Sequence, residues 1–337
     1  MSLHIGIAYD LKSDAVPAKG QPDDILEEYD SPETVAALGR ALGDLGHETI
    51  DLGGGRRFLE TMLSGRPRPD LIFNIAEGRG SRSREAHVPA ACEMLGIPYT
   101  HSDPLTMALT LDKNLTKRIA LSHGIPTAPF CLIERSEDLA AARLPPFPVI
   151  AKPNGEGSSM GIRRDSLCAD SAALARRVEL LLSDYRQPVL VESFLPGAEV
   201  TVAVLGNGPN ARALAAMEIA PQSGNNDTFI YSLETKRNYL AEVDYHVPPR
   251  LPSSTIAAIE ERAVAIYRAI GCRDTARIDL RLDAAGQPCL VEVNALPGLD
   301  PLRSDLPIMC GRLGVSYQEL IDRIVRHATD RWQLARR

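Results

Sequence analysis

The sequence predicts a mixed α/β protein whose N-terminal part is a doubly wound parallel domain. Strand and helix patterns alternate over the first part of the chain, which is typical of βαβ crossovers and a mostly parallel sheet. Longer strands dominate from PVLVES onward. A chain of 337 residues also exceeds one ordinary core, so we expect separate units at 1–100, 101–187 and 188–337.

The first unit opens with the strand pattern HIGIAYD. Ser31 is expected to cap the next helix, and Gly46 to end that helix in a left-handed conformation. HETIDL and DLIFNI supply two further strands. Because ligands bind outside the carboxyl ends of parallel strands, Tyr9, Asp10 and the polar segment 74–85 are candidates for function.

Later segments predict a different mixture of elements. Gly53 to Gly55 is interpreted as a turn. We expect helices at about 104–123, 171–183, 253–270 and from 316, strands at FCLIE and PVIAKP, a hairpin at 275–294, and a polar loop at 222–243.

Composition argues against several classes of protein. A formal net charge of -7 leaves no basic surplus for a nucleic-acid backbone. The sequence has neither a signal-peptide pattern nor the ~20 apolar residues of a spanning helix, so no membrane partner is expected. Scattered cysteines without a C-x-x-C pair, and histidines without ligand spacing, argue against disulfides and transition metals. A reducing cytoplasm fits these features best.

Two strands near the end, ARIDLRLD and CLVEVNALPG, carry the strongest chemical signal. If their turn is centred between the second alanine and the glycine of DAAGQP, Asp279 lies opposite Glu292 and Arg277 lies opposite Asn294. Two carboxylates and an amide form a hard oxygen set that suits Mg²⁺ beside nucleotide phosphates, and the arginine suits a developing oxyanion. The alternative is a solvent-facing hairpin held by cross-strand salt bridges.

A glycine-rich segment, AKPNGEGSSMGI, gives a second signal. Lys152 ends a strand, and glycines surround Ser158 and Ser159. Such a loop can cover phosphates with backbone amides, hydroxyls and one ammonium group. An ordinary hairpin turn explains the same pattern.

A third signal is the segment VESFLPGAEV, where Glu192 and Glu199 flank Leu195. Carboxylates can accept hydrogen bonds from an adenine amino group and from ribose hydroxyls, while aliphatic side chains line the base. Taken alone, both glutamates are interpreted as surface residues.

These three segments, in this order and spacing, resemble the ATP-grasp superfamily and, within it, the D-alanine–D-alanine ligase family. The resemblance runs along the whole chain and includes LGIPYTHSDPLTMALTLDKNLTK, KPNGEGSSMG, E-x-x-L-P-G-x-E, R-x-D and E-x-N. It implies a Rossmann-like N-terminal domain at 1–100, followed by an α+β ATP-grasp fold with a lid at 101–187 and a catalytic part at 188–337.

The resemblance also implies roles for individual residues. The ATP contacts of the family correspond to Lys113, Lys152, Ser158, Ser159, Glu192, Leu195, Glu199 and Lys236. Its metal ligands correspond to Asp279, Glu292 and Asn294. Its catalytic groups correspond to Arg277, Ser158 and an N-terminal glutamate, Glu28.

Three departures from the family pattern concern the substrate. The tyrosine that follows the loop lysine is replaced by Arg237. The H-x-x-x-G-E-D-G segment is replaced by NIAEGRGSRSREAHVPA, whose Arg79, Arg82 and Arg84 indicate either a more acidic substrate or a solvated loop. PGLDPLRSDLP is one residue longer than usual, which leaves Ser304 as the counterpart of the contact to the acceptor carboxylate.

The substitution at Arg237 gives a hypothesis about the substrate. A buried arginine needs a partner, which would be an acidic substrate group or a neighbouring acid such as Glu234 or Glu28, unless the side chain turns to solvent. If the partner is an acidic group of the substrate, we expect D-alanine to be a poor substrate and at least one substrate to be larger or to carry an extra carboxylate.

The function implied by the resemblance is ATP-dependent ligation of a carboxylate to an amine through an acyl phosphate. ATP, two Mg²⁺ ions (Mn²⁺ as a substitute), small amino acid or peptide substrates and a homodimer are expected. The first interpretation is D-alanine–D-alanine ligation for peptidoglycan. The alternatives are the same chemistry on another amino acid or small peptide, and a nucleotide-binding sensor that no longer ligates.

Overall fold

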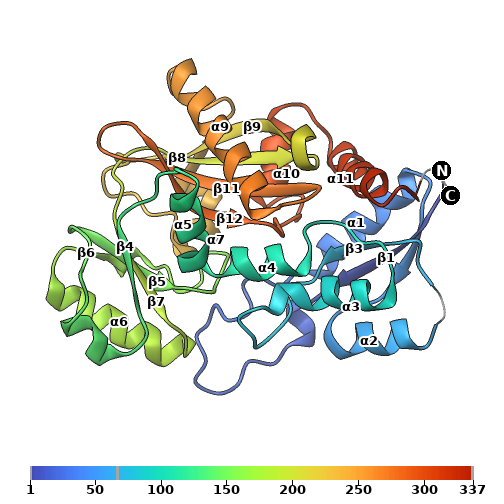
Figure 1. Cartoon of the computed structure of the whole chain (residues 1–337), viewed down its shortest axis with the longest axis horizontal. Helices are drawn as coiled ribbons and strands as arrows, with labels where there is room; N and C mark the ends of the chain where they lie inside the picture. Colours follow the sequence, from blue (N-terminus) through green and yellow to red (C-terminus); the bar gives the residue numbers. More distant parts are fainter. Residues whose placement is uncertain (1, 66–67, 335–337) are drawn as a thin grey trace.

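The computed structural model describes residues 2–65 and 68–334, which form three β-sheets surrounded by helices (Figure 1). One sheet has the strand order β2-β1-β3, the second β4-β7-β5-β6, and the third β10-β9-β8-β11-β12. The described residues also include five short 3-10 helices: η1 Lys12–Asp14, η2 Arg84–Ala86, η3 Ser136–Ala140, η4 Arg164–Ser166 and η5 Gly208–Asn210.

The first sheet is parallel, as the alternating pattern predicts. Its strands are β1 (His4–Tyr9), β2 (Glu48–Asp51) and β3 (Leu71–Ile75), and its helices are α1 (Pro32–Asp44), α2 (Gly55–Leu63) and α3 (His87–Leu95). Ser31 caps α1, since its hydroxyl accepts from the Thr34 amide at 3.2 Å, and Gly46 follows the helix with φ 85°. The sequence interpretation placed a turn at Gly53 to Gly55 but missed α2, which begins within those glycines and buries Phe58 and Met62 one turn apart.

The second sheet is antiparallel and covered by one helix. Its strands are β4 (Phe130–Ile133), β5 (Val149–Pro153), β6 (Leu167–Cys168) and β7 (Val189–Ser193), with α6 (Ser171–Tyr185) packed on it. The helical stretch before it divides into α4 (Pro104–Leu111) and α5 (Lys113–Ser122), because the Asp112 side chain accepts from the Leu115 amide at 3.0 Å and starts a new helix.

The third sheet is also antiparallel and contains the predicted hairpin. Its strands are β8 (Glu199–Leu205), β9 (Arg212–Pro221), β10 (Val243–His246), β11 (Thr275–Leu282) and β12 (Pro288–Asn294). Its helices are α7 (Leu233–Arg237), α8 (Tyr239–Glu242), α9 (Ser253–Ile270), α10 (Asp305–Arg312) and α11 (Tyr317–Arg331). The chain passes from the second sheet to the third between β7 and β8. Sheet membership alone does not define folding units, so the boundaries at 100 and 187 stay predictions.

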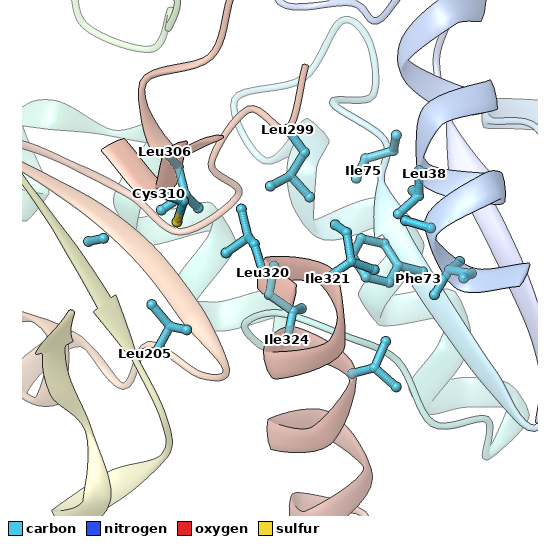
Figure 2. Close-up of a cluster of buried hydrophobic side chains, with 14 of the residues drawn as sticks. Leu38, Phe73, Ile75, Leu205, Leu299, Leu306, Cys310, Leu320, Ile321 and Ile324 are labelled. Atoms are coloured by element: carbon cyan, nitrogen blue, oxygen red, sulfur yellow. The ribbon is translucent and has the colours of Figure 1, made fainter. Parts of the chain in front are cut away.

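One hydrophobic core joins the first sheet to the third. Figure 2 shows Ile321 and Ile324 of α11 beside Phe73 of β3 and Leu38 of α1 on one side, with Leu205 of β8 on the other. The four-stranded sheet has a separate core with α6. The first and third sheets are therefore fixed to each other by apolar packing, and the second is not part of that core.

The helices within the described ranges, 2–65 and 68–334, are all too short or too polar to cross a lipid bilayer.

Candidate active site

A cavity of about 560 Å³ lies among the three sheets, at the carboxyl end of β3 and against the hairpin β11–β12. Its wall includes eight of the residues that the sequence singles out: Glu28, Lys113, Ser158, Lys236, Arg237, Arg277, Glu292 and Asn294, with Ser304 as a ninth. Six others lie outside this wall: Lys152, Ser159, Glu192, Leu195, Glu199 and Asp279.

The register of the hairpin is the predicted one around its polar face. Asp279 pairs with Glu292, and Arg277 pairs with Asn294. The Asn294 amide donates to the Asp279 carboxylate at 2.9 Å, and the Thr201 hydroxyl donates to it at 2.6 Å. The register shifts immediately afterwards, because Leu280 pairs with Leu290 across a bulge. We call the group Lys113, Arg277, Asp279, Glu292 and Asn294 the hairpin end of the cavity.

Charges at the hairpin end are matched in pairs. Arg277 donates two hydrogen bonds to Asp279, at 3.0 and 3.1 Å, and lies 3.3 Å from Asp305. The Lys113 ammonium lies 3.3 Å from the Glu292 carboxylate. Burial raises the pKa of Glu292, but Lys113, Lys152 and Arg277 outweigh it and bring the value to about 2, so the carboxylate is ionised at neutral pH.

Behind this end lies a buried triad that the sequence reveals only in part. Lys152, at the end of β5, lies 2.5 Å from Glu192 on the neighbouring strand β7, and Lys117 lies 2.7 Å from the other carboxylate oxygen. Burial opposes ionisation of Glu192, yet the two ammonium groups bring its pKa to about 2. Lys117 was not predicted, although its spacing of four from Lys113 puts both on one helical face.

Glu199 is held by a residue that sequence reasoning left without a role. Arg281 lies 3.0 Å from Glu199, donates to the carbonyl of Phe229 at 2.8 Å, and stacks on the ring of Phe194 with 4.5 Å to its centroid. Burial raises the pKa of Glu199 to about 7 despite Arg281. Leu195 follows Phe194 in the same connection and is half-buried.

The glycine-rich segment contains two serines with a left-handed backbone conformation. Ser158 and Ser159 have φ of 47° and 59°, in the left-handed region that ordinary residues rarely adopt. The Ser159 hydroxyl donates to the carbonyl of Tyr231 at 2.9 Å, which ties this turn to the 222–243 segment. Ser158 faces the cavity.

The 222–243 segment contains helices α7 and α8 as well as the predicted loop. Lys236 lines the cavity, and none of the residues placed in the structure pairs with it. Burial lowers the pKa of Lys236. Arg237 pairs with Asp23 at 3.1 Å and Glu27 at 2.8 Å, so neither predicted partner, Glu234 or Glu28, is its partner, because α7 lies against the segment that precedes Glu28.

Glu28 is joined on the cavity wall by Glu77 and Glu85, two acids of the candidate segment 74–85 that were given no individual role. Acceptor atoms of Glu28, Glu77 and Glu85 lie within 4.8 Å of one another, and all three residues line the cavity. Burial, and then repulsion from Glu28, raise the pKa of Glu85 to about 8, and the same causes raise that of Glu77. We call these three residues the acidic wall.

The family is decided by comparison with known proteins. Residues 119–326 match the family model described as D-ala D-ala ligase C-terminus, which is more than half of the chain. The chain is 38% identical to a D-alanine–D-alanine ligase of Bordetella avium over 264 residues, covering 77% of this chain and 78% of that protein. This protein belongs to the D-alanine–D-alanine ligase family.

Other relatives of this ATP-grasp ligase family include an uncharacterised protein, y4sG, of Sinorhizobium fredii, which is 36% identical over 87% of this chain and 86% of its own length. The fold matches the crystal structure of the Bacillus anthracis D-alanine–D-alanine ligase complexed with ATP, with a TM-score of 0.72, 20% identity and 99% of both chains covered. It also matches the VanG D-Ala:D-Ser ligase of Enterococcus faecalis, with a TM-score of 0.71, 22% identity, and 97% and 100% covered.

The three arginines that replace acids of the family pattern do not form a common cationic surface. Arg84 is buried, lies 2.7 Å from Glu28 and 3.0 Å from Glu156, and donates to the Gly155 carbonyl. Arg79 donates to the Tyr29 hydroxyl, and the largely exposed Arg82 lies 2.8 Å from Asp112. Arg79 and Arg82 are exposed and Arg84 is buried, so the solvated-loop interpretation fits the first two arginines and not the third.

Ser304 lies at the mouth of the cavity, immediately before α10. Its hydroxyl accepts from the Asp300 amide at 3.1 Å, and its side chain packs so closely on Gly298 that a Cβ there would lie 2.7 Å from the hydroxyl oxygen. The longer segment between Pro297 and Asp305 is therefore a compact turn that keeps Ser304 facing the cavity.

Proposed function

We propose that this protein is an ATP-dependent carboxylate–amine ligase that forms a peptide bond through an acyl phosphate. The observation that carries the proposal is the hairpin end, where Lys113, Arg277 and Glu292 line the cavity. Arg277 and the Asn294 amide both hydrogen-bond the adjacent carboxylate of Asp279. Membership of the family supports ligase chemistry.

In this proposal the ATP phosphates lie between the glycine-rich turn and the hairpin end. Lys113 and Lys152 would neutralise phosphate charge, backbone amides near Ser158 and Ser159 would donate to phosphate oxygens, and Lys236 would approach the γ-phosphate. The base and ribose would lie near Glu192, Leu195 and Glu199. The side chain of Arg281 now holds Glu199, so ribose binding requires Glu199 to accept a second donor or to exchange partners.

The donor set at the hairpin end fits Mg²⁺. Asp279 and Asn294 are linked by a hydrogen bond, Glu292 lies opposite Asp279, and Glu292 is ionised, as a metal ligand must be. Asp279, Glu292 and Asn294 would hold two ions, which neutralise charge on the phosphates when bound. Mn²⁺ has the same preference for oxygen ligands and would substitute.

The protein's own residues then position and stabilise the reacting groups. A substrate carboxylate would attack the γ-phosphorus of ATP and displace ADP. Arg277 would stabilise the tetrahedral species that forms when the deprotonated amine attacks the acyl phosphate and that then releases inorganic phosphate. Glu28 and Ser158 would orient the first substrate, and Ser304 the carboxylate of the second. Exclusion of water by the glycine-rich turn would protect the acyl phosphate from hydrolysis.

D-alanine is the first substrate to test, and another amino acid or small peptide is the second candidate. The departures from the family pattern in the segment 74–90 and around Ser304 favour the second candidate, whereas Arg237 already pairs with Asp23 and Glu27. A homodimer is also proposed, and sedimentation in solution tests it.

The decisive experiment measures ADP release with ATP and Mg²⁺ against a panel of D- and L-amino acid pairs, with nucleotide binding measured separately. ADP release that depends on both an amino acid and Mg²⁺ supports the proposal. Tight ATP binding with no turnover on any pair would leave a nucleotide-binding protein and reject ligation.

A further inference from the structure

The acidic wall brings three carboxyl groups together on one side of the cavity. Glu77 is the second residue after β3, and Glu85 belongs to η2. The fold brings these two acids, eight positions apart, together with Glu28. All three face the same cavity as the hairpin end.

The hydrogen bonding of the three carboxylates is unequal. Glu28 accepts from the Gly157 amide at 2.6 Å and from Arg84 at 2.7 Å. Across residues 2–65 and 68–334, no group donates a hydrogen bond to Glu77 or Glu85, and neither forms an ion pair. Glu85 is only 8% exposed, and what exposure it has is toward the cavity.

Other buried acids in the molecule do have cationic partners. Glu192 has two ammonium groups, and Glu218 is bound by Arg250. A buried carboxylate without a donor is costly, so such a group in a ligand cavity is expected to meet its donor on the ligand. Asp30, which also lines the cavity and receives no side-chain donor within the described part of the chain, extends the same negative surface.

The donor that fits is an organic cation and not a divalent metal ion. A metal bound by all three acids would compete with the hydrogen bonds that Glu28 accepts from Gly157 and Arg84, and it would lie beside the guanidinium of Arg84. An ammonium or guanidinium group needs only Glu77 and Glu85, and it donates two or more hydrogen bonds to them.

We infer that one substrate carries a cationic side chain, in addition to its α-amino group, and that Glu77 and Glu85 bind this cation. The inference rests on the proposed ligase function and narrows its substrate to the basic amino acids or peptides that contain one. It also reverses the hypothesis of an acidic substrate, because the arginines behind that hypothesis already have protein partners.

The test is a comparison of substrates on the native chain. ADP release would be measured with 2,4-diaminobutyrate, ornithine, lysine and arginine, with alanine and with aspartate, each as both enantiomers and each paired with alanine. We expect kcat/KM for the best basic amino acid to exceed that for alanine by at least ~10-fold, the usual effect of one charge-assisted hydrogen bond.

Variants then assign the preference to the acidic wall. Glu77→Gln and Glu85→Gln keep side-chain volume, and together they should remove most of the preference for basic substrates while leaving the affinity for ATP unchanged. Glu179→Gln, on the outer surface of α6, is the matched control and should change neither. Melting temperatures would verify that each variant is folded.

The outcomes are distinct. Preference for alanine or aspartate, or a basic preference that survives both substitutions, overturns the inference while the ligase proposal stands. Binding of Mn²⁺ that is lost in the Glu77→Gln/Glu85→Gln variant would identify the wall as a metal site and also overturn it. ADP release on no substrate, despite ATP binding, rejects the ligase proposal itself. If the double variant does not fold, the substrate order of the native chain decides.

Discussion

At the hairpin end of the cavity acids and bases come in matched pairs, whereas at the acidic wall Glu77 and Glu85 face the cavity with no partner among the residues that the structure describes. The difference is visible in the acids themselves: the pKa of Glu292 is lowered to about 2 by Lys113, Lys152 and Arg277 against the effect of burial, and burial raises that of Glu85 to about 8. One end is a charged framework complete before a ligand arrives. The other lacks the charge that a ligand would bring.

The largest effect should follow from breaking the hairpin end. Glu292→Gln removes an ionised oxygen that faces Lys113, and we expect kcat for ADP release to fall by ~10²–10³-fold, the usual loss when one preorganised charged group is removed from an active site. Steady-state assays at saturating ATP measure this change. A loss below 10-fold would show that this carboxylate is not part of the reacting site, and Glu179→Gln is the control.

The second prediction concerns nucleotide affinity. Lys152→Met keeps the aliphatic stem but removes the ammonium, while Glu192 keeps Lys117 at 2.7 Å, so the fold should survive. We expect the Kd for ATP to rise roughly 10–100-fold, in line with one lost hydrogen bond to a charged group. Calorimetry decides, and an unchanged Kd would remove Lys152 from the proposed nucleotide site. Glu192→Ala should weaken binding in the same assay.

The third prediction is that stability depends on pH with opposite sign at the two ends. The lowered pKa of Glu192 means that its carboxylate stabilises the folded protein above pH 4.5, and that this stability is lost as pH falls toward 2. The raised pKa of Glu85 means that the folded protein binds that proton more tightly than the unfolded chain does, so stability falls as pH rises from about 5 to 8.

Two substitutions separate these effects. Glu192→Gln leaves two buried ammonium groups with no counterion and should cost about 3–5 kcal/mol at pH 7, with a smaller loss at pH 3. Glu85→Gln cannot ionise, so its melting temperature should exceed that of the native chain by roughly 5 °C at pH 8 and should equal it at pH 5. If the melting temperatures of both variants differed from that of the native chain in the same way at every pH, the contrast between the two ends would be wrong.

The smallest effect is expected at Arg237. Its side chain is 41% exposed and pairs with Asp23 and Glu27, and exposed pairs of this kind contribute about 0.2–1 kcal/mol. Arg237→Tyr should therefore change kcat/KM by less than ~5-fold for every amino acid. A larger change confined to one class of substrate would place Arg237 in the substrate site.

The hairpin end could be predicted from sequence because its geometry is local. Alternation along β11 and β12, together with one turn, determines that Asp279 faces Glu292. The bulge after Asp279 has no such signal, and the prediction fails there. Short helices such as α2 and α10 were missed because eight or nine residues give too few apolar repeats for recognition.

The acidic wall could not be predicted in the same way. Glu77 and Glu85 lie in a loop whose path depends on Asp10, which accepts from the Gly78 amide at 2.8 Å, and on Arg84, which reaches across to the Gly155 carbonyl. These contacts join parts of the chain separated by about 70 positions, and neither periodicity nor propensity reports on them. The arginines were visible in the sequence, but their partners were not.

The core shared through α11 has a consequence for how the protein is made. Leu38 and Phe73 emerge early from a ribosome, yet the residues that cover them, Ile321 and Ile324, are translated about 250 residues later. At ordinary synthesis rates of ~5–20 residues per second, the first sheet waits for over ten seconds with one apolar face uncovered. The four-stranded sheet has no such delay, because α6 is translated before β7 and completes that core locally. During synthesis the exposed face of the first sheet is therefore where a chaperone would be needed most.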